Sequence, residues 1–216
     1  MRRKDQALRR EQLARAGRQV LLERGAVGLR VKDIAERAGL APSSVLYYYP
    51  HIGDLLLEVS RDAIDRYAER RAREVRRLDD PAEQLRLAIR LGVPTGPDDE
   101  ESRLLYELDA LTGTSPAFAV MTTSFFDRQV MLYEYVLRSG AAQGSLKLAQ
   151  AAETIARGLV ALEDGLGLQV VTGHPGIDST EAERILLSYA SMATGVRLET
   201  VPLVQAKDAK DGVNAS

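Results

Sequence analysis

The sequence contains no cysteine and no tryptophan among its 216 residues, and it has only three phenylalanines. The absence of cysteine excludes disulfide scaffolds, thiolate zinc sites and cysteine nucleophiles. Because aromatic residues are few, the core must be built mainly from aliphatic side chains. No apolar run approaches the roughly 18 residues of a membrane span, and polar residues rather than an apolar stretch follow Met1–Lys4. We therefore expect a soluble, cytoplasmic protein with no membrane partner.

Features of metal binding and catalysis are also scarce. The two histidines, His51 and His174, do not stand at a metal-ligand spacing from each other. The segment Gly165–Gly167 lacks the preceding strand and the third glycine of a dinucleotide-binding fingerprint. The acidic run Asp98–Glu101 follows Pro97 and is typical of the first turn of a helix. We expect a protein that is not an enzyme and has no metal and no cofactor; an all-α enzyme is a remote alternative.

Charge is distributed unevenly along the chain. Residues 1–77 hold 18 Lys and Arg against 11 Asp and Glu, a net charge of +7, whereas residues 78–216 have a net charge of −9. The overall composition, with 45% hydrophobic and 28% charged residues, is that of a folded protein. A basic N-terminal part joined to an acidic remainder is typical of a nucleic-acid-binding module attached to a domain that does not bind nucleic acid.

The spacing of apolar residues predicts helices throughout and no strands, and therefore an all-α fold. A first helix is predicted over 5–24, where Gly25 supplies a C-terminal stop. Gly and Pro residues separate the later segments. The further predicted helices are 31–38, 42–49, 54–77, 82–92, 99–112, 116–139, 146–171 and 179–196. The polar segment 199–216 is predicted to be a disordered tail.

The segment 31–49 has the pattern of a helix-turn-helix. Ile34, Ala35 and Ala38 form the apolar side of a short helix, and Gly39 allows a sharp turn. Val45 and Leu46 are expected to anchor the second helix from beneath. The residues left at the start and on the outer face of that helix are Pro42, Ser43, Ser44, Tyr47 and Tyr48. In a helix-turn-helix this face reads the major groove, and hydroxyl groups suit base edges and phosphates; an ordinary helical hairpin is the alternative.

These residues resemble the DNA-binding domain of the tetracycline-repressor (TetR) family of bacterial transcriptional regulators. The resemblance is carried by the Asp-Ile-Ala-x-x-Ala-Gly pattern at 33–39, the aromatic run Tyr47–Pro50 and the Leu55-Leu56 pair. It implies a three-helix DNA-binding domain over 1–52 and a helical ligand-binding and dimerisation domain over 53–198. It also implies a homodimer that acts as a repressor and is released from double-stranded operator DNA by an unidentified small-molecule effector.

Some residues depart from the family pattern. The family usually has Ser or Thr at the position of Arg30, Tyr at that of Leu46 and a phosphate-contacting Lys at that of Ile52. Arg30, Lys32 and His51 are the candidates to contact phosphates instead. Ile52 either leaves each subunit with one phosphate contact fewer or packs inward at the start of the fourth helix. These departures keep open an alternative, a ligand-binding protein of the same fold that has lost or altered its DNA binding.

The second half resembles the C-terminal domain of choline-responsive, BetI-type regulators, on the segments 140–144 and 161–166. The resemblance implies a dimer interface formed by the last two long helices. Its candidate residues are Ile155, Leu159, Leu162, Leu166, Ile185, Tyr189 and Met192. A ligand pocket would lie among the fourth to eighth helices, with Tyr106, Phe118, Met121, Phe125, Phe126, Met131 and Tyr133 as candidate lining residues. A choline-type cation would need an aromatic cage built without tryptophan.

Overall fold

The computed structural model describes residues 2–199, and the backbone in this range forms helices and no strand, which confirms the predicted all-α fold. The elements are α1 (Arg2–Gly28), α2 (Val31–Ala38), α3 (Pro42–Tyr48), α4 (Ile52–Arg76), α5 (Pro81–Gly92), α6 (Glu100–Asp109), a 3-10 turn (Thr112–Thr114), α7 (Pro116–Ala142), α8 (Ala152–Val171) and α9 (Ser179–Thr194). No helix within 2–199 is long and apolar enough to cross a membrane. The predicted tail, apart from Glu199, lies outside the described residues.

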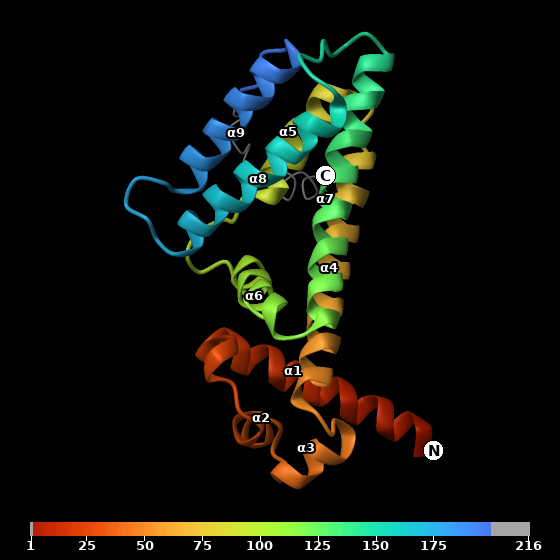
Figure 1. Ribbon diagram of the computed structural model, residues 1–216, viewed down its shortest axis with the longest axis vertical. Coiled ribbons are helices and arrows are strands. Elements are labelled where there is room, and N and C mark those ends of the chain that lie inside the picture. The colour runs from red at the N-terminus through yellow and green to blue at the C-terminus, as the bar shows by residue number, and fades with distance from the viewer. Residues whose placement is uncertain (1, 200–216) are drawn as a thin grey trace, which may run out of the picture.

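The helices form a small group and a larger group joined by one long helix (Figure 1). We call α1, α2, α3 and the start of α4 the head, and the remainder the body. The head core is aliphatic, and its fully buried members include Leu13, Leu21, Ile34, Val45 and Leu55. These positions recur at helical spacing because one face of each helix is turned inward. The head core does not end at residue 52, since Leu104, Leu108 and Phe118 of the body pack into it.

The turn between α2 and α3 depends on a glycine. Gly39 has φ 65° and ψ 37°, a left-handed conformation that favours a residue without a Cβ atom. This conformation ends α2 and lets the Leu40 amide donate to the carbonyl oxygen of Ala35 at 2.9 Å. An ion pair between Arg24 and Asp33, 2.8 Å long, ties α1 to α2. The orientation of α3 is therefore fixed by backbone geometry as well as by packing.

The body packs α5, α7, α8 and α9 with the C-terminal half of α4 around a second core (Figure 1). Its fully buried residues include Leu85, Ile89, Val136, Leu137 and Leu159. Because α4 begins in the head and ends in the body core, it connects the two groups by a continuous helical backbone.

Several predicted helix boundaries differ in the structure, and the largest difference is at the start of α8. The helix predicted over 146–171 begins only at Ala152. The residues before it run beside the end of α9, where the amides of Lys147 and Ala149 donate to carbonyl oxygens at 2.8 Å each. Tertiary hydrogen bonds have replaced helical ones in this segment. The helix predicted over 99–112 ends at Asp109, and a 3-10 turn follows.

A second connection between head and body lies at the break in α1. Gly25 has φ 71°, and α1 resumes for one turn after it. The carboxylate of Glu107, on α6, accepts a hydrogen bond from the amide of Ala26 at 2.7 Å. Nearby, Arg103 donates to the carbonyl oxygen of Leu22 at 3.1 Å. α6 therefore satisfies backbone groups of α1 that the break leaves without helical partners.

Replacing Glu107 should weaken this connection. We expect Glu107→Ala to lower the free energy of unfolding by about 1.5 kcal/mol, the cost of a hydrogen bond to a charged group. For a chain of this size that is a fall in Tm of roughly 3–6 °C. Glu69→Ala, which removes an exposed carboxylate on α4, is the matched control in a thermal melt. Equal melting temperatures for the two variants would show that the Glu107 contact contributes nothing.

Candidate DNA-reading surface and ligand cavity

The outer face of α3 presents polar and aromatic side chains to solvent. Pro42, Ser43 and Tyr47 are exposed, and Tyr47 is 72% accessible. Ser44 and Tyr48 are half-buried, and Tyr48 packs against the head core. The rings of Tyr47 and Tyr48 meet edge to face with centroids 5.1 Å apart. Of the predicted reading residues, the structure therefore turns Ser43 and Tyr47 outward most fully, and Tyr48 supports Tyr47 from behind.

The sequence predicted that Leu46 anchors α3 from beneath, and this prediction is wrong. Leu46 is 44% exposed, whereas Val45 is fully buried. Leu46 follows Pro42 by four residues and Ser43 by three, so helical geometry places it on the outer face with them. An apolar side chain on this face suits the methyl group of thymine. Its helical spacing from Ser43 was the available indication that Leu46 faces outward, but the sequence prediction placed it on the inner face.

Basic side chains stand at the starts of α2 and α4, and they form no ion pair within residues 2–199. Arg30, at the N-cap of α2, and Lys32 are exposed, and His51 is exposed at the N-cap of α4. No side chain caps α4, so its first amides are free of side-chain partners and suit phosphate oxygens. Ile52 is half-buried and packs against the head core. This placement favours the inward interpretation of Ile52.

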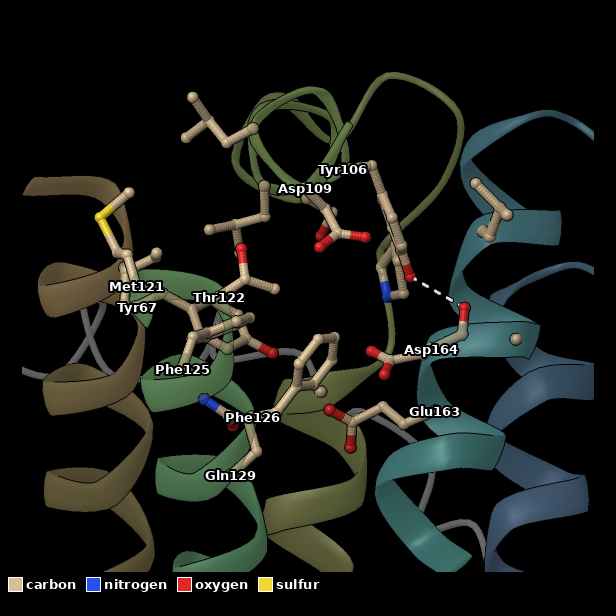
Figure 2. A pocket seen from close by; sticks show the side chains of 18 residues that line it. Tyr67, Tyr106, Asp109, Met121, Thr122, Phe125, Phe126, Gln129, Glu163 and Asp164 are labelled. Atoms are coloured by element: carbon tan, nitrogen blue, oxygen red, sulfur yellow. Dashed lines mark hydrogen bonds between the residues drawn. The ribbon is translucent and has the colours of Figure 1, made fainter. Parts of the chain in front are cut away.

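A cavity of about 300 Å³ lies among α4, α6, α7 and α8 (Figure 2). Its walls are mainly aromatic and aliphatic, with a few polar groups among them. The lining side chains include Tyr67, Tyr106, Asp109, Met121, Phe125, Phe126, Gln129, Glu163 and Asp164. Phe125 lies between Tyr67 and Phe126, with ring centroids 5.8 Å and 6.0 Å away. An apolar cavity with a few polar groups is the usual form of a small-molecule site.

Three carboxyl groups face this cavity, and they differ in their partners (Figure 2). Glu163 forms an ion pair with the guanidinium of Arg71 at 2.6 Å. Asp164, the next residue, forms no ion pair within residues 2–199; the Tyr106 hydroxyl donates to its backbone carbonyl at 3.2 Å, not to its carboxyl group. Burial, together with the negative charges of Glu163 and Asp109, raises the pKa of Asp164 to about 7. At neutral pH the Asp164 carboxyl group is therefore either protonated or carries a negative charge that no ion pair offsets.

A buried arginine lies directly beneath the cavity. The side chain of Arg71, on α4, is entirely buried. It donates to the carbonyl oxygen of Ala88, to Gln129, to the hydroxyl of Tyr133 and to both oxygens of Glu163. Burial disfavours the charge, but the Glu163 carboxylate together with Tyr67 and Tyr133 outweighs this effect and raises the pKa of Arg71 well above its ordinary value. The guanidinium is therefore a permanent cation inside the body.

Four of the predicted pocket residues line the cavity, namely Tyr106, Met121, Phe125 and Phe126. Three do not, and their assignments are corrected. Phe118 lies one helical turn before Met121 and is buried in the head core. Met131 is 65% exposed, because it lies on the opposite face of α7. Tyr133 lies one turn deeper than Gln129 and bonds to Arg71 instead of facing the cavity.

The predicted interface residues divide in the same way. Ile155, Leu159 and Leu166 are buried in the core of their own subunit, so they are not available to a partner, and this part of the prediction is corrected. Leu162, Ile185 and Tyr189 are half-buried, and Met192 is 72% exposed. The outer face of α8 also carries Ala161, Gly165 and Leu168, all exposed. Apolar spacing identified the helices but not which of two apolar faces is turned outward.

The sequence analysis missed the polar part of the cavity. Tyr67 was not among the candidate lining residues, and Glu163 and Asp164 entered only as part of the segment 161–166 that carries the family resemblance. A pair of adjacent acids inside the otherwise apolar stretch 158–168 was the available indication. No group of three or more His, Asp or Glu side chains suited to a metal ion occurs within residues 2–199.

The fold and the two sites define a class of protein, a helix-turn-helix head on a helical body that holds a small-molecule cavity. Family models agree with this description. Residues 13–59 match the model of bacterial regulatory proteins of the tetR family, and residues 81–194, more than half of the chain, match the C-terminal domain of BetI-type transcriptional repressors. The chain belongs to the TetR family of transcriptional regulators and carries a BetI-type C-terminal domain, as the sequence predicted.

Solved structures show the same relationship, while no curated protein matches the chain. A transcriptional regulator from Saccharomonospora viridis, solved in complex with choline, is 26% identical, with a TM-score of 0.79 over 86% of this chain and 96% of its own. A TetR regulator from Haloarcula marismortui is 22% identical, with a TM-score of 0.76 over 87% and 99%. FadR from Bacillus subtilis, solved with stearoyl-CoA, is 16% identical, with a TM-score of 0.64 over 86% and 98%. The last two show the fold alone.

The unusual pKa of Asp164 makes a prediction about stability. The unfolded chain ionises this carboxyl at its ordinary pKa of 3.8 and the folded chain at about 7, so ionisation favours the unfolded state as pH rises between these values. We expect Asp164→Asn to raise the Tm at pH 8 by on the order of 5 °C, and this gain to vanish as the pH falls toward 4. Asp98→Asn, at an exposed position, is the control; a gain that does not depend on pH would contradict the assignment.

Proposed function

We propose that this protein is a dimeric repressor that leaves its operator when a small organic cation, of the size and type of choline, occupies the cavity. The observation that carries the proposal is the uncompensated carboxyl of Asp164 in a cavity lined by aromatic rings. Membership of the TetR family supplies the regulatory framework. Operator binding would place the protein with the chromosome in the bacterial cytoplasm.

The cavity offers a cation two kinds of attraction. The rings of Tyr67, Tyr106, Phe125 and Phe126 present π-faces and edges, and a cation over such a face gains about 0.5–2 kcal/mol. Asp164 adds a carboxylate that no cation of the described chain pairs with. A quaternary ammonium group bound beside Asp164 would therefore stabilise the ionised carboxylate, which then releases its proton. The choline held by the Saccharomonospora viridis regulator, which is 26% identical, supports this ligand class.

The route from cavity to DNA would run along α4. Ile64 and Tyr67 line the cavity, and the same helix begins at Ile52 beside the exposed face of α3. A change at one end of a rigid helix moves the other, and two heads must be spaced by one DNA turn, about 34–36 Å, to read two half-sites. The effector must bind the conformation with the wrong spacing more tightly, since equal affinity for both conformations shifts nothing.

A second copy would supply the second head. Ala161, Gly165 and Leu168 of α8 and Met192 of α9 are exposed and are all small or apolar, and Gly165 and Leu168 also belong to the cavity lining. Small residues allow helices of two subunits to approach closely, and a two-fold axis through this surface would relate the heads as a palindromic operator requires. We therefore assign the dimer interface to this face and not to the buried side of α8.

Choline and its neutral isostere dimethylbutanol, which has carbon in place of nitrogen, test the ligand class. Only about a tenth of Asp164 is ionised at pH 6 if its pKa is about 7, so we expect calorimetry to show choline binding up to about tenfold tighter at pH 8 than at pH 6. Dimethylbutanol should bind more weakly and without this pH dependence. Asp164→Asn should remove the dependence for choline. Equal affinities for the two compounds would contradict a cationic effector.

The reading face is tested with Tyr47→Ala, which removes an exposed ring outside the core. We expect about tenfold weaker binding to an operator duplex selected in vitro with the wild-type protein, because a lost base or phosphate contact costs about 1–3 kcal/mol. Melting temperature and dimerisation should not change. Tyr135→Ala, at an exposed position on α7, is the control. If the wild-type protein selects no DNA, the alternative of a ligand-binding protein without DNA binding is correct.

A further inference from the structure

The hydrogen bonds of Arg71 join four helices at one point. The guanidinium comes from α4, and its acceptors are the Ala88 carbonyl of α5, Gln129 and Tyr133 of α7, and Glu163 of α8; we call these five residues the Arg71 clamp. The Nη1 and Nη2 atoms lie 2.8 Å and 2.6 Å from the two Glu163 oxygens, a bidentate geometry. α4 therefore cannot slide or rotate relative to the body while the clamp is closed.

Two members of the clamp are also walls of the cavity. Glu163 and Gln129 line it (Figure 2), whereas Arg71 is not a lining residue but bonds to both of them. A molecule in the cavity is therefore in reach of the same carboxylate that the guanidinium binds. Space around the pair is restricted, since a Cβ atom at Gly92 would come within 2.2 Å of the Glu163 carboxyl group and 2.4 Å of Arg71 Nη2. A Glu163 carboxylate attracted toward the cavity must weaken its bond to Arg71 and the hydrogen bond that the Tyr133 hydroxyl donates to it.

We propose that Glu163 is shared between two cations, the Arg71 guanidinium in the empty protein and the effector in the occupied protein, and that this exchange releases α4. The inference rests on the cationic effector proposed above. Arg71 is a positioning residue, because it acts on DNA binding through α4 and does not face the cavity. Arg71 also competes with the effector for Glu163, the carboxyl group that lines the cavity beside Asp164.

The remaining members of the clamp make the exchange feasible. When Glu163 turns to the cavity, the Ala88 carbonyl, the Gln129 side chain and the Tyr133 hydroxyl still accept hydrogen bonds from Arg71. The guanidinium keeps neutral partners while it loses its charged one, so it is not left without acceptors. These partners belong to α5 and α7, so α4 loses its charged tie to α8 and becomes free to shift relative to it.

The exchange is tested by separating ligand binding from its effect on DNA. Arg71→Met removes the competitor, and Arg66→Met is the control, since Arg66 lies on the same helix but is exposed and pairs only with Asp62 one turn away. Choline affinity is measured by calorimetry. The coupling ratio is the operator Kd with saturating choline divided by the Kd without it, on the duplex selected with the wild-type protein.

We expect Arg71→Met to bind choline at least threefold more tightly than wild type while its coupling ratio falls to about 1. Its operator affinity without choline should equal that of the wild-type protein saturated with choline. Arg66→Met should match wild type in all three measurements. If Arg71 has only a structural role, Arg71→Met will lower the Tm and leave the coupling ratio and the choline affinity unchanged, and the proposal is wrong.

A second variant guards against misfolding of the first. Replacing a buried ion pair with apolar residues of similar volume is often neutral or stabilising, so Arg71→Met/Glu163→Met should fold. We expect this double variant to have a coupling ratio of about 1; a wild-type ratio would overturn the proposal. If wild type binds no choline but Arg71→Met still weakens operator binding relative to Arg66→Met, the cationic effector and the exchange are wrong, and only the hold of the clamp on α4 is supported.

Discussion

A single buried positive charge constrains the whole body of this protein. The Arg71 guanidinium has no contact with water, so it must find acceptors inside, and it draws them from α5, α7 and α8. The requirement fixes how α4 sits against these helices. It also places a carboxylate at the floor of the cavity, because the partner that neutralises the charge, Glu163, is a cavity residue.

The electrostatic character of the cavity follows from this pairing. Arg71 neutralises Glu163 but only partly offsets the environment of Asp164, whose pKa burial and the neighbouring acids raise to about 7. Three carboxyl groups line the cavity, those of Asp109, Glu163 and Asp164, and the buried cation Arg71 pairs with Glu163 alone. The aromatic rings around the cavity exclude water and supply π-faces, so an organic cation is suited to offset the remaining negative charge. The ligand class and the coupling that we propose thus have a common physical origin.

Long-range contact between head and body has a second component at α6. Glu107 and Arg103 bond to backbone groups of α1, and the same helix contributes Tyr106 and Asp109 to the cavity. The head is therefore attached both through the continuous backbone of α4 and through hydrogen bonds from α6. The inclusion of Leu104 and Phe118 in the head core has the same consequence, since the head is not an independent unit ending at residue 52.

The local sequence determined the class of this protein. Helical spacing, the glycine at position 39 and the charge contrast between the two halves predicted an all-α protein with a helix-turn-helix, because these features depend on neighbours in the chain. Tertiary structure alone decided which faces are buried. Phe118 and Met131 share α7 with Phe125, yet only Phe125 meets the cavity. The hydrogen-bond partners of Arg71 are distant from it in the sequence, so the spacing of residues along one helix could not predict them.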